Sequence, residues 1–528
     1  MAMLTETKAW QSLQAHSSRF QRPDFKLADL VGTQSGRFAE FSLQVDNLLL
    51  DFSKNVLTAE TFDLLLQLAE QQRVPAAITA MYAGDTINGS EQRAALHIAL
   101  REPPRSARFP EVAETLQRID DLVTAVLAGD HCGYSGEAIT DIVNLGVGGS
   151  DLGPALVVSA LHHVRETRLN VHFVSNIDPL HLQATLSGLN PSTTLFIVAS
   201  KSFTTLETLH NANTARNWLL ARAHDAAAVA SHFLAVTSNQ KAAIAFGIEP
   251  DHILPMWDWV GGRFSLWSAI GLPIAFAQGV GKFRELLSGA HAMDQHFQNA
   301  PLKKNMPVIL ALLSVWYRGF FASHSSAVIP YSQALKLLPA FLQQLSMESL
   351  GKSVTIADET VRYHTGEPVW GAAGTDVQHS CFQMLHQGTN FIPVDFIVAA
   401  HASTDNDTEA HQHLLANCLS QSLALMQGAV DSSNPCRKVP GNRPSNTLLL
   451  RELNAYNLGN LLALYEHKTY VQSVIWNINA FDQWGVQLGK TLSHELFAII
   501  QSENAATISA TKLDDSTANL LDFLENWK

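Results

Sequence analysis

The sequence predicts an α/β protein with two mainly parallel sheets, each covered by helices, and a helical N-terminal region before them. The chain has 528 residues, more than one compact core usually contains, so at least two domains are expected. Hydrophobic residues make up 46% of the chain and charged residues 16%, which is typical of a well-packed globular protein. In two separate parts of the chain, short apolar runs alternate with amphipathic stretches, the pattern of a parallel sheet covered by helices.

The first hundred or so residues have mainly helical spacing. The exception is residues 37–51, where apolar and polar residues partly alternate around Asp46 and Asn47, which predicts a hairpin. Residues 87–101 return to helical spacing.

The first alternation begins near residue 142. Four apolar runs read as buried strands, and a helix-like segment follows each of them. These runs are IVNLGV (142–147), VHFVS (171–175), TTLFIVAS (193–200) and FLAVTS (233–238).

The second alternation predicts strands in AVIPYS (327–332), NFIPVDFIVAA (390–400) and YVQSVIW (470–476). The segments expected to form helices are 338–347, 409–426 and 458–466. The run 306–316 is the longest strongly apolar one, and it is too short to span a bilayer, so it predicts a buried helix. We therefore expect an N-terminal region over 1–110, one α/β domain over 111–296, a second over 306–505, and a helical tail over 506–528.

The composition excludes several classes of partner. A net charge of −13 disfavours broad attraction to nucleic acid or to an anionic membrane. The N-terminus has no apolar core of the kind that a secretory signal needs. The cysteines are widely separated, which predicts reduced thiols in a cytoplasmic protein rather than a disulfide framework or a zinc motif. They are Cys132, Cys381, Cys418 and Cys436.

Two strand-to-helix turns carry the candidate chemistry. The first, residues 146–151, nearly matches a dinucleotide fingerprint, but Asp151 stands where the third glycine would be. A carboxylate there would lie near a pyrophosphate, which argues against nucleotide binding. Glycines that only let the chain bend explain this turn at least as well.

The second turn follows the strand TTLFIVA and gathers four hydroxyl groups, those of Ser200, Ser202, Thr204 and Thr205. Glu207 then opens a helix, and hydroxyls with free N–H groups at a helix N-terminus suit a phosphate monoester. The alternative is simple helix capping, for which one hydroxyl is enough. We therefore favour a phosphate site.

Five segments, in this order along the chain, resemble the phosphoglucose isomerase family, whose members have the sugar isomerase (SIS) fold. They are NLGVGGSDLGP, ASKSFTTLET, WVGGRFSLWSAIG, QLSMESLGK with GTDVQHSCFQMLHQGT, and VIWNINAFDQWGVQLGK. The resemblance implies two SIS-type α/β/α sandwich domains, with the N-terminal region packed on the second, and a homodimer whose active sites lie at the subunit interface. It also implies an enzyme of glycolysis and gluconeogenesis that interconverts glucose 6-phosphate and fructose 6-phosphate. The reaction would proceed by ring opening and an enediolate, with no cofactor and no metal.

The resemblance also implies roles for individual residues. Glu348, in Met-Glu-Ser, would be the base that moves a proton between C2 and C1. His379, reaching the site from the partner subunit, and Lys490 would open the sugar ring, and Arg263 would stabilise the enediolate. The expected substrate-binding residues are Gly149, Ser150, Ser200, Lys201, Ser202, Thr205 and Gln483.

Some residues near these positions depart from the family pattern. Ser202 replaces a usual threonine and keeps the hydroxyl. Leu350, Asp376, Val377 and Cys381 also differ from the common residues, and we expect them to affect rate and pH optimum rather than reaction class.

Three other functions stay open from the sequence. One is a SIS-fold enzyme for an amino-sugar or mannose phosphate, and another is a sugar-phosphate sensor, which would lack the base. The third is a nucleotide-dependent oxidoreductase built on residues 146–149. The ordered motif set favours the isomerase over all three.

Overall fold

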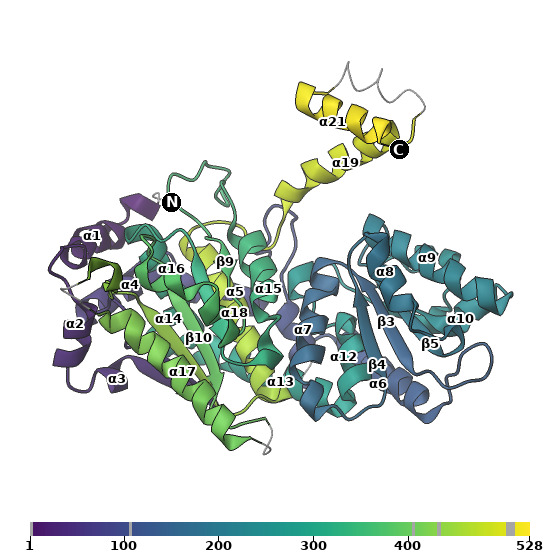
Figure 1. Ribbon diagram of the computed structural model, residues 1–528, viewed down its shortest axis with the longest axis horizontal. Coiled ribbons are helices and arrows are strands. Elements are labelled where there is room, and N and C mark those ends of the chain that lie inside the picture. Colours follow the sequence, from purple (N-terminus) through teal and green to yellow (C-terminus); the bar gives the residue numbers. More distant parts are fainter. Residues whose placement is uncertain (1–3, 105–107, 404–406, 430–433, 503–512, 528) are drawn as a thin grey trace. The chain divides into compact units, whose positions relative to one another are not determined.

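The computed structural model describes residues 4–104, 108–403, 407–429, 434–502 and 513–527. The chain divides into two compact units, Met1–Phe481 and Asp482–Lys528 (Figure 1). The first unit contains both sheets. The second contains the helices α19 (Gln487–Ile500) and α21 (Asp515–Asn526).

The first sheet has five strands in the order β4-β3-β5-β6-β7, and all of its pairings are parallel. Its four predicted strands are confirmed, and a short fifth strand follows them. Strands β3 and β5 are buried along nearly their whole length, which explains their almost continuous apolar runs. The strands are β3 (Asp141–Gly146), β4 (Asn170–Val174), β5 (Thr194–Ala199), β6 (Phe233–Thr237) and β7 (Ile253–Pro255).

Helices cover both faces of this sheet, as Figure 1 shows. Alternate residues along a strand enter different clusters: Ile142 packs in one and Val143 in the other. On the Ile142 side lie α6 (Pro110–Ala128), α7 (Leu152–Ala160) and α12 (Leu272–Gln278). On the Val143 side lie α8 (Pro179–Leu186), α9 (Leu206–Ala223), α10 (Ala228–His232) and α11 (Gln240–Phe246).

The second sheet has six strands in the order β1-β2-β11-β10-β8-β9. The hairpin expected in residues 37–51 is present as β1 (Ser42–Val45) and β2 (Leu48–Asp51). Strand β2 pairs antiparallel with β11, so the hairpin extends a sheet whose other strands are parallel. Those strands are β8 (Ser326–Pro330), β9 (Val369–Trp370), β10 (Val394–Ala399) and β11 (Ser445–Leu450).

This sheet is also sandwiched between helices. Ala327, Ile329 and Phe396 pack with α16 (Phe382–Gln387) and α17 (Thr408–Gln427). On the other face, Val328 and Ile397 pack in the large core. That core includes side chains of α13 (Val280–Asn299), α14 (Met306–Phe320), α15 (Leu338–Gln343) and α18 (Ala455–Ile475). Helix α14 confirms the buried helix predicted over 306–316.

The N-terminal region is mainly helical, as predicted. Its helices are α1 (Lys8–Ser17), α2 (Leu27–Thr33), α3 (Arg37–Glu40), α4 (Ala59–Gln71) and α5 (Val74–Ala83).

The predicted strand 470–476 is wrong, because these residues belong mostly to helix α18. Asn454 caps this helix by accepting a hydrogen bond from the Asn457 amide, and the helix is buried on nearly every side. A helix without a polar face shows no helical periodicity, so a short apolar window of it resembles a strand. The sequence reading also missed β11, which begins with the polar residues Ser445, Asn446 and Thr447.

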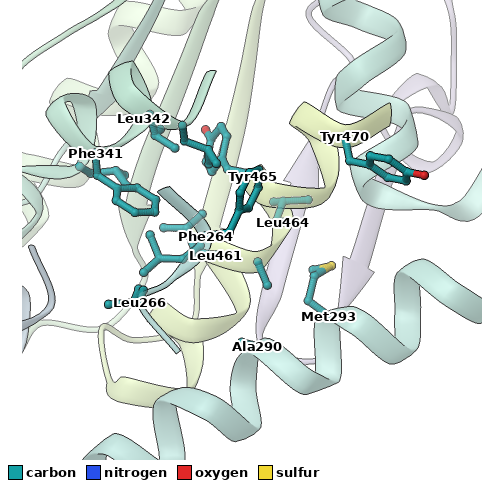
Figure 2. Close-up of a cluster of buried hydrophobic side chains, with 14 of the residues drawn as sticks. Phe264, Leu266, Ala290, Met293, Phe341, Leu342, Leu461, Leu464, Tyr465 and Tyr470 are labelled. Atoms are coloured by element: carbon teal, nitrogen blue, oxygen red, sulfur yellow. The ribbon is translucent and has the colours of Figure 1, made fainter. Parts of the chain in front are cut away.

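Helices α13 and α18 pack against each other in the core that adjoins the candidate site. Figure 2 shows Ala290 and Met293 of α13 near Leu461 and Leu464 of α18. The same cluster includes Phe264, which follows Arg263 directly, and Phe341 and Leu342 of α15. The core thus fixes the backbone on both sides of the site described next.

Candidate active site

The first Gly-rich turn lies between β3 and α7, as predicted. A Cβ atom added to Gly149 would lie 1.9 Å from the carbonyl oxygen of Gly262, so only glycine permits this contact. Gly148 has φ +60, and a Cβ atom there would lie 2.9 Å from Nε2 of Gln344. The glycines therefore let the turn pack against the Arg263 segment and against the helix that leads to Glu348.

Arg263 and Glu348 form the centre of the site. Nη1 of Arg263 lies 3.5 Å from Oε2 of Glu348. The guanidinium is buried, and its Nε donates to Oγ of Ser349 over 2.6 Å, while Nη2 donates to the carbonyl of Ala480. These bonds fix the orientation of the guanidinium and keep one of its nitrogens next to the carboxylate.

Glu348 ends a π-helical turn, Gln344–Glu348, that continues α15. Such turns occur often at functional sites. Nε2 of Gln344 donates to Oε2 of Glu348 over 3.1 Å. The Glu348 side chain is 24% exposed, so its carboxylate is held by two donor groups but stays open to a small molecule.

The second turn lies between β5 and α9, at the same edge of the sheet as the first. Oγ of Ser200 donates to Oγ1 of Thr205 over 3.1 Å, and the hydroxyls of Ser202 and Thr204 are 2.6 Å apart. Thr205 is the N-cap residue of α9 but makes no side-chain capping bond. Since the hydroxyls bond to each other and not to the helix, the amides of the first turn of α9 are available to an anion.

Lys201 connects this turn to the chain before Arg263. Its Nζ donates to the carbonyl oxygens of Asp258 and Val260, over 3.2 and 3.1 Å, and lies 3.6 Å from Oδ1 of Asp258. Burial lowers the pKa of Lys201, and Asp258 partly opposes that effect. The Gly-rich turn, the hydroxyl turn and the Arg263 segment thus meet at the carboxyl edge of the first sheet.

His379 lies away from Glu348 in the same chain. Gly374 donates to the carbonyl of Pro330, at the carboxyl end of β8, and the Tyr331 hydroxyl donates to Gln378, next to His379. Val377 packs with the cluster on the α16 and α17 face of the second sheet. His379 is exposed and makes no polar side-chain contact with a described residue.

Glu348, in contrast, lies toward the amino end of the same strand and over the other face. Leu345 and Leu350 pack in the large core on the α14 and α15 face. The carbonyl of Leu350 accepts from Gly366, which shortly precedes β9, and β9 pairs with the first residues of β8. The segments that carry Glu348 and His379 therefore pack on opposite faces of the second sheet.

Gln483 and Lys490 belong to the C-terminal unit. Gln483 precedes the 3₁₀ turn Trp484–Val486, and Lys490 lies exposed in the first turn of α19. Their roles stay predictions.

Sequence reasoning missed Gln344, Ser349 and the carbonyl of Ala480 as parts of the site. Gln344 could have been found, since it precedes Glu348 by four residues on a predicted helix and so lies on the same face. Nothing in the sequence pairs Arg263 with Ala480, 217 positions away along the chain.

No group of three or more His, Cys, Asp or Glu side chains among the described residues could hold a metal ion. None of the described helices combines the length and apolar character needed to cross a bilayer.

The paired carboxylate and guanidinium, the Gly-rich turn and the hydroxyl-rich helix N-terminus lie on α/β/α sandwiches, an arrangement suited to a small phosphorylated substrate. The family model for phosphoglucose isomerase matches residues 51–521. The chain therefore belongs to the phosphoglucose isomerase family.

Individual relatives agree with that assignment. The chain is 49% identical to glucose-6-phosphate isomerase 1 of Thiobacillus denitrificans, with 95% of each chain covered. It is 48% identical to glucose-6-phosphate isomerase of Shewanella baltica over the whole of both chains. Among solved structures, it matches a glucose-6-phosphate isomerase of Chlamydia trachomatis with a TM-score of 0.86 and 32% identity, over 96% of this chain and 98% of that one.

Proposed function

We propose that this chain interconverts glucose 6-phosphate and fructose 6-phosphate by transferring a proton between C2 and C1 of the open-chain sugar. The observation that carries the proposal is the Arg263–Glu348 pair, in which a partly exposed carboxylate lies 3.5 Å from a buried, fixed guanidinium. One group can act as base and the other can stabilise the negative charge that forms. The family membership supports the same reaction.

The phosphate of the substrate binds at the hydroxyl turn in this account. Ser200, Ser202 and Thr205 offer hydroxyls, and α9 offers free amides and the positive end of its dipole. Gly149 and Ser150, on the neighbouring turn, line the same edge of the sheet. Lys201 holds this turn to the segment before Arg263 and adds positive charge. An anchored phosphate leaves the reacting carbons at a fixed distance from Glu348.

The proton shuttle uses a single carboxylate. Glu348 removes the proton from C2, and the electron pair of that C–H bond forms the C1–C2 double bond of an enediolate. Arg263 faces the oxygen on which charge develops, and preorganised donors of this kind lower a barrier by about 3–4 kcal/mol. Glu348 then returns the proton to C1, and the hydroxyl proton on O2 moves to O1, which gives the ketose. Gln344 keeps the carboxylate in place throughout, through its 3.1 Å hydrogen bond.

Ring opening requires further groups, and we assign it to His379 of a second copy of the chain and to Lys490. The separation of His379 from Glu348 across the second sheet supports a histidine donated by a partner subunit. In that homodimer each active site takes Glu348 from one chain and His379 from the other. Gln483 lines the sugar-phosphate site, and the enzyme works in the cytoplasm.

A coupled assay tests this proposal. Purified protein treated with a chelator is given fructose 6-phosphate, and glucose 6-phosphate is detected with a dehydrogenase that reduces a nicotinamide cofactor. We expect full activity without any added metal. No glucose 6-phosphate, or activity that returns only when a divalent cation is added, would contradict the metal-free proton-transfer mechanism.

A further inference from the structure

The Gly-rich turn of the candidate site ends in a buried acid that the mechanism above does not use. Asp151 is 8% exposed, and its Oδ1 has no hydrogen-bond partner among the described residues. It stands at the N-cap position of α7 but makes no side-chain capping bond there. A buried carboxylate with an unsatisfied oxygen is costly, whereas a protonated carboxyl can donate a hydrogen bond.

A second unsatisfied oxygen lies beneath the same turn. Asn144 of β3 donates from Nδ2 to the carbonyl of Ser150 over 3.0 Å, but its own Oδ1 is buried without a partner in the described part of the chain. Ser150 thus lies between a strand residue and a carboxyl group that each have a buried oxygen without a hydrogen-bond partner in the described part of the chain. Protonation of Asp151 removes its negative charge from this buried environment.

We propose that Asp151 controls phosphate binding: while its carboxyl is protonated, the 146–150 turn accommodates a dianionic phosphate held at the neighbouring hydroxyl turn, and ionisation weakens this binding. The inference rests on the proposed phosphate site at the carboxyl edge of the first sheet. Ionised Asp151 places a negative charge one residue after Ser150, where it repels the dianion, and its buried Oδ1 then has no hydrogen-bond partner among the described residues.

Burial of Asp151 opposes its ionisation, so the pH at which the carboxyl ionises moves up toward neutral. Burial raises the pKa of Asp151 to about 6, against a hydrogen bond from Ser175 and the nearby charge of His181. Several other titratable or charged groups lie on elements that pack against this turn and α7. They are Asp178 beside α8, Arg263, Glu348, Lys336 and the two histidines of the 3₁₀ turn His162–Val164.

The direction in which phosphate affinity changes with pH follows from the linkage between proton binding at Asp151 and phosphate binding. If phosphate binds better to the protonated form, binding raises the pKa of Asp151 further. Affinity is then greatest below pH 6 and falls as the pH rises through the pKa of the free enzyme. The loss is about tenfold for each pKa unit by which binding raises that value.

The test compares wild type with Asp151→Asn, which keeps the shape, carries no charge and supplies a permanent N–H donor. KM for fructose 6-phosphate is measured from pH 5.5 to 8 and expressed as the ratio of wild-type to variant KM. Because the substrate phosphate ionises in the same way in both assays, its effect on KM cancels in this ratio. We expect the ratio to rise at least about threefold over this range, with kcat alike in both proteins. Asp251→Asn is the matched control, because it removes an exposed carboxylate at the far edge of the same sheet and should leave the ratio flat.

Inhibition by sulfate, a dianion that does not titrate in this range, gives a second readout on wild-type enzyme. We expect its inhibition constant to increase with pH in wild type and in Asp251→Asn. If Asp151→Asn does not fold, this increase in wild type must still be present. A flat KM ratio, or a sulfate inhibition constant in wild type that does not change with pH, would overturn the role of Asp151. The isomerase reaction itself would stand, since all of these measurements require an active enzyme.

Discussion

Nη1 of Arg263 lies 3.5 Å from Oε2 of Glu348, although Arg263 follows the last strand of the first sheet and Glu348 lies between two strands of the second. The same guanidinium donates to Ser349 and to Ala480, so three distant parts of the chain meet at one side chain. Arg263 is therefore a structural link between these segments, and in the proposed mechanism it also faces the developing charge.

Replacing Arg263 by lysine keeps the charge but loses the planar fork that reaches Ser349, Ala480 and Glu348 together. We expect kcat to fall by about 10²–10³-fold, the effect of losing one preorganised donor. Steady-state kinetics and a melting curve, measured on the same preparation, separate lost catalysis from lost folding. Arg118→Lys is the control, since Arg118 bonds only carbonyls near β7 and should leave kcat unchanged. A folded Arg263→Lys enzyme with near-normal kcat would contradict this role.

The double change Ser200→Ala with Thr205→Ala removes two hydroxyls from the proposed phosphate turn. Each lost hydrogen bond to a charged group costs about 1.5–3 kcal/mol, so KM should increase by tenfold or more while kcat changes less. Thr214→Ala on α9, whose hydroxyl only bonds the carbonyl of His210, serves as the control. If KM stays unchanged in the double variant, these hydroxyls do not bind the phosphate.

The placement of His379 predicts complementation between two inactive variants. Glu348→Gln and His379→Ala chains carrying different tags are co-expressed, and the mixed dimers are purified. If histidine is donated across the interface, each mixed dimer has one intact site and should show about half the wild-type activity. If His379 acts in its own chain, neither site is intact and the mixed dimers stay inactive.

The sequence predicted the parallel strands and the two turns well, because buried parallel strands and strand-to-helix turns have strong local patterns. It mistook the end of α18 for a strand, since burial on all sides removes the helical period there. It missed β11, whose polar first half pairs with β10 and pairs with β2 from Thr447 onward. Local patterns carry no information about which distant segments pair.

The same limit applies to the site. Glu348 and Arg263 were found by their resemblance to family motifs, but no pattern showed that Ser349 bonds Arg263, 86 positions earlier in the chain. The sequence also did not show why position 149 must be glycine, because the backbone that a Cβ atom there would clash with, at Gly262, lies far along the chain. From the sequence, Asp151 argued against a nucleotide fingerprint and a sharp bend explained the glycines at least as well; the structure adds close packing against the Arg263 segment.

Hydrogen exchange with deuterated solvent measures directly whether Glu348 moves the proton between C2 and C1. An open-chain substrate analogue in deuterated solvent bypasses ring opening, so exchange of its C2 proton reports only the base. Glu348→Gln keeps the size and hydrogen bonding of the side chain but removes the basic oxygen. General-base catalysis is worth about 10²–10⁴-fold, so exchange should fall by that factor while His379→Ala exchanges at nearly the wild-type rate. Normal exchange by Glu348→Gln would show that another group is the base, and equal loss in His379→Ala would contradict the division between ring opening and proton transfer.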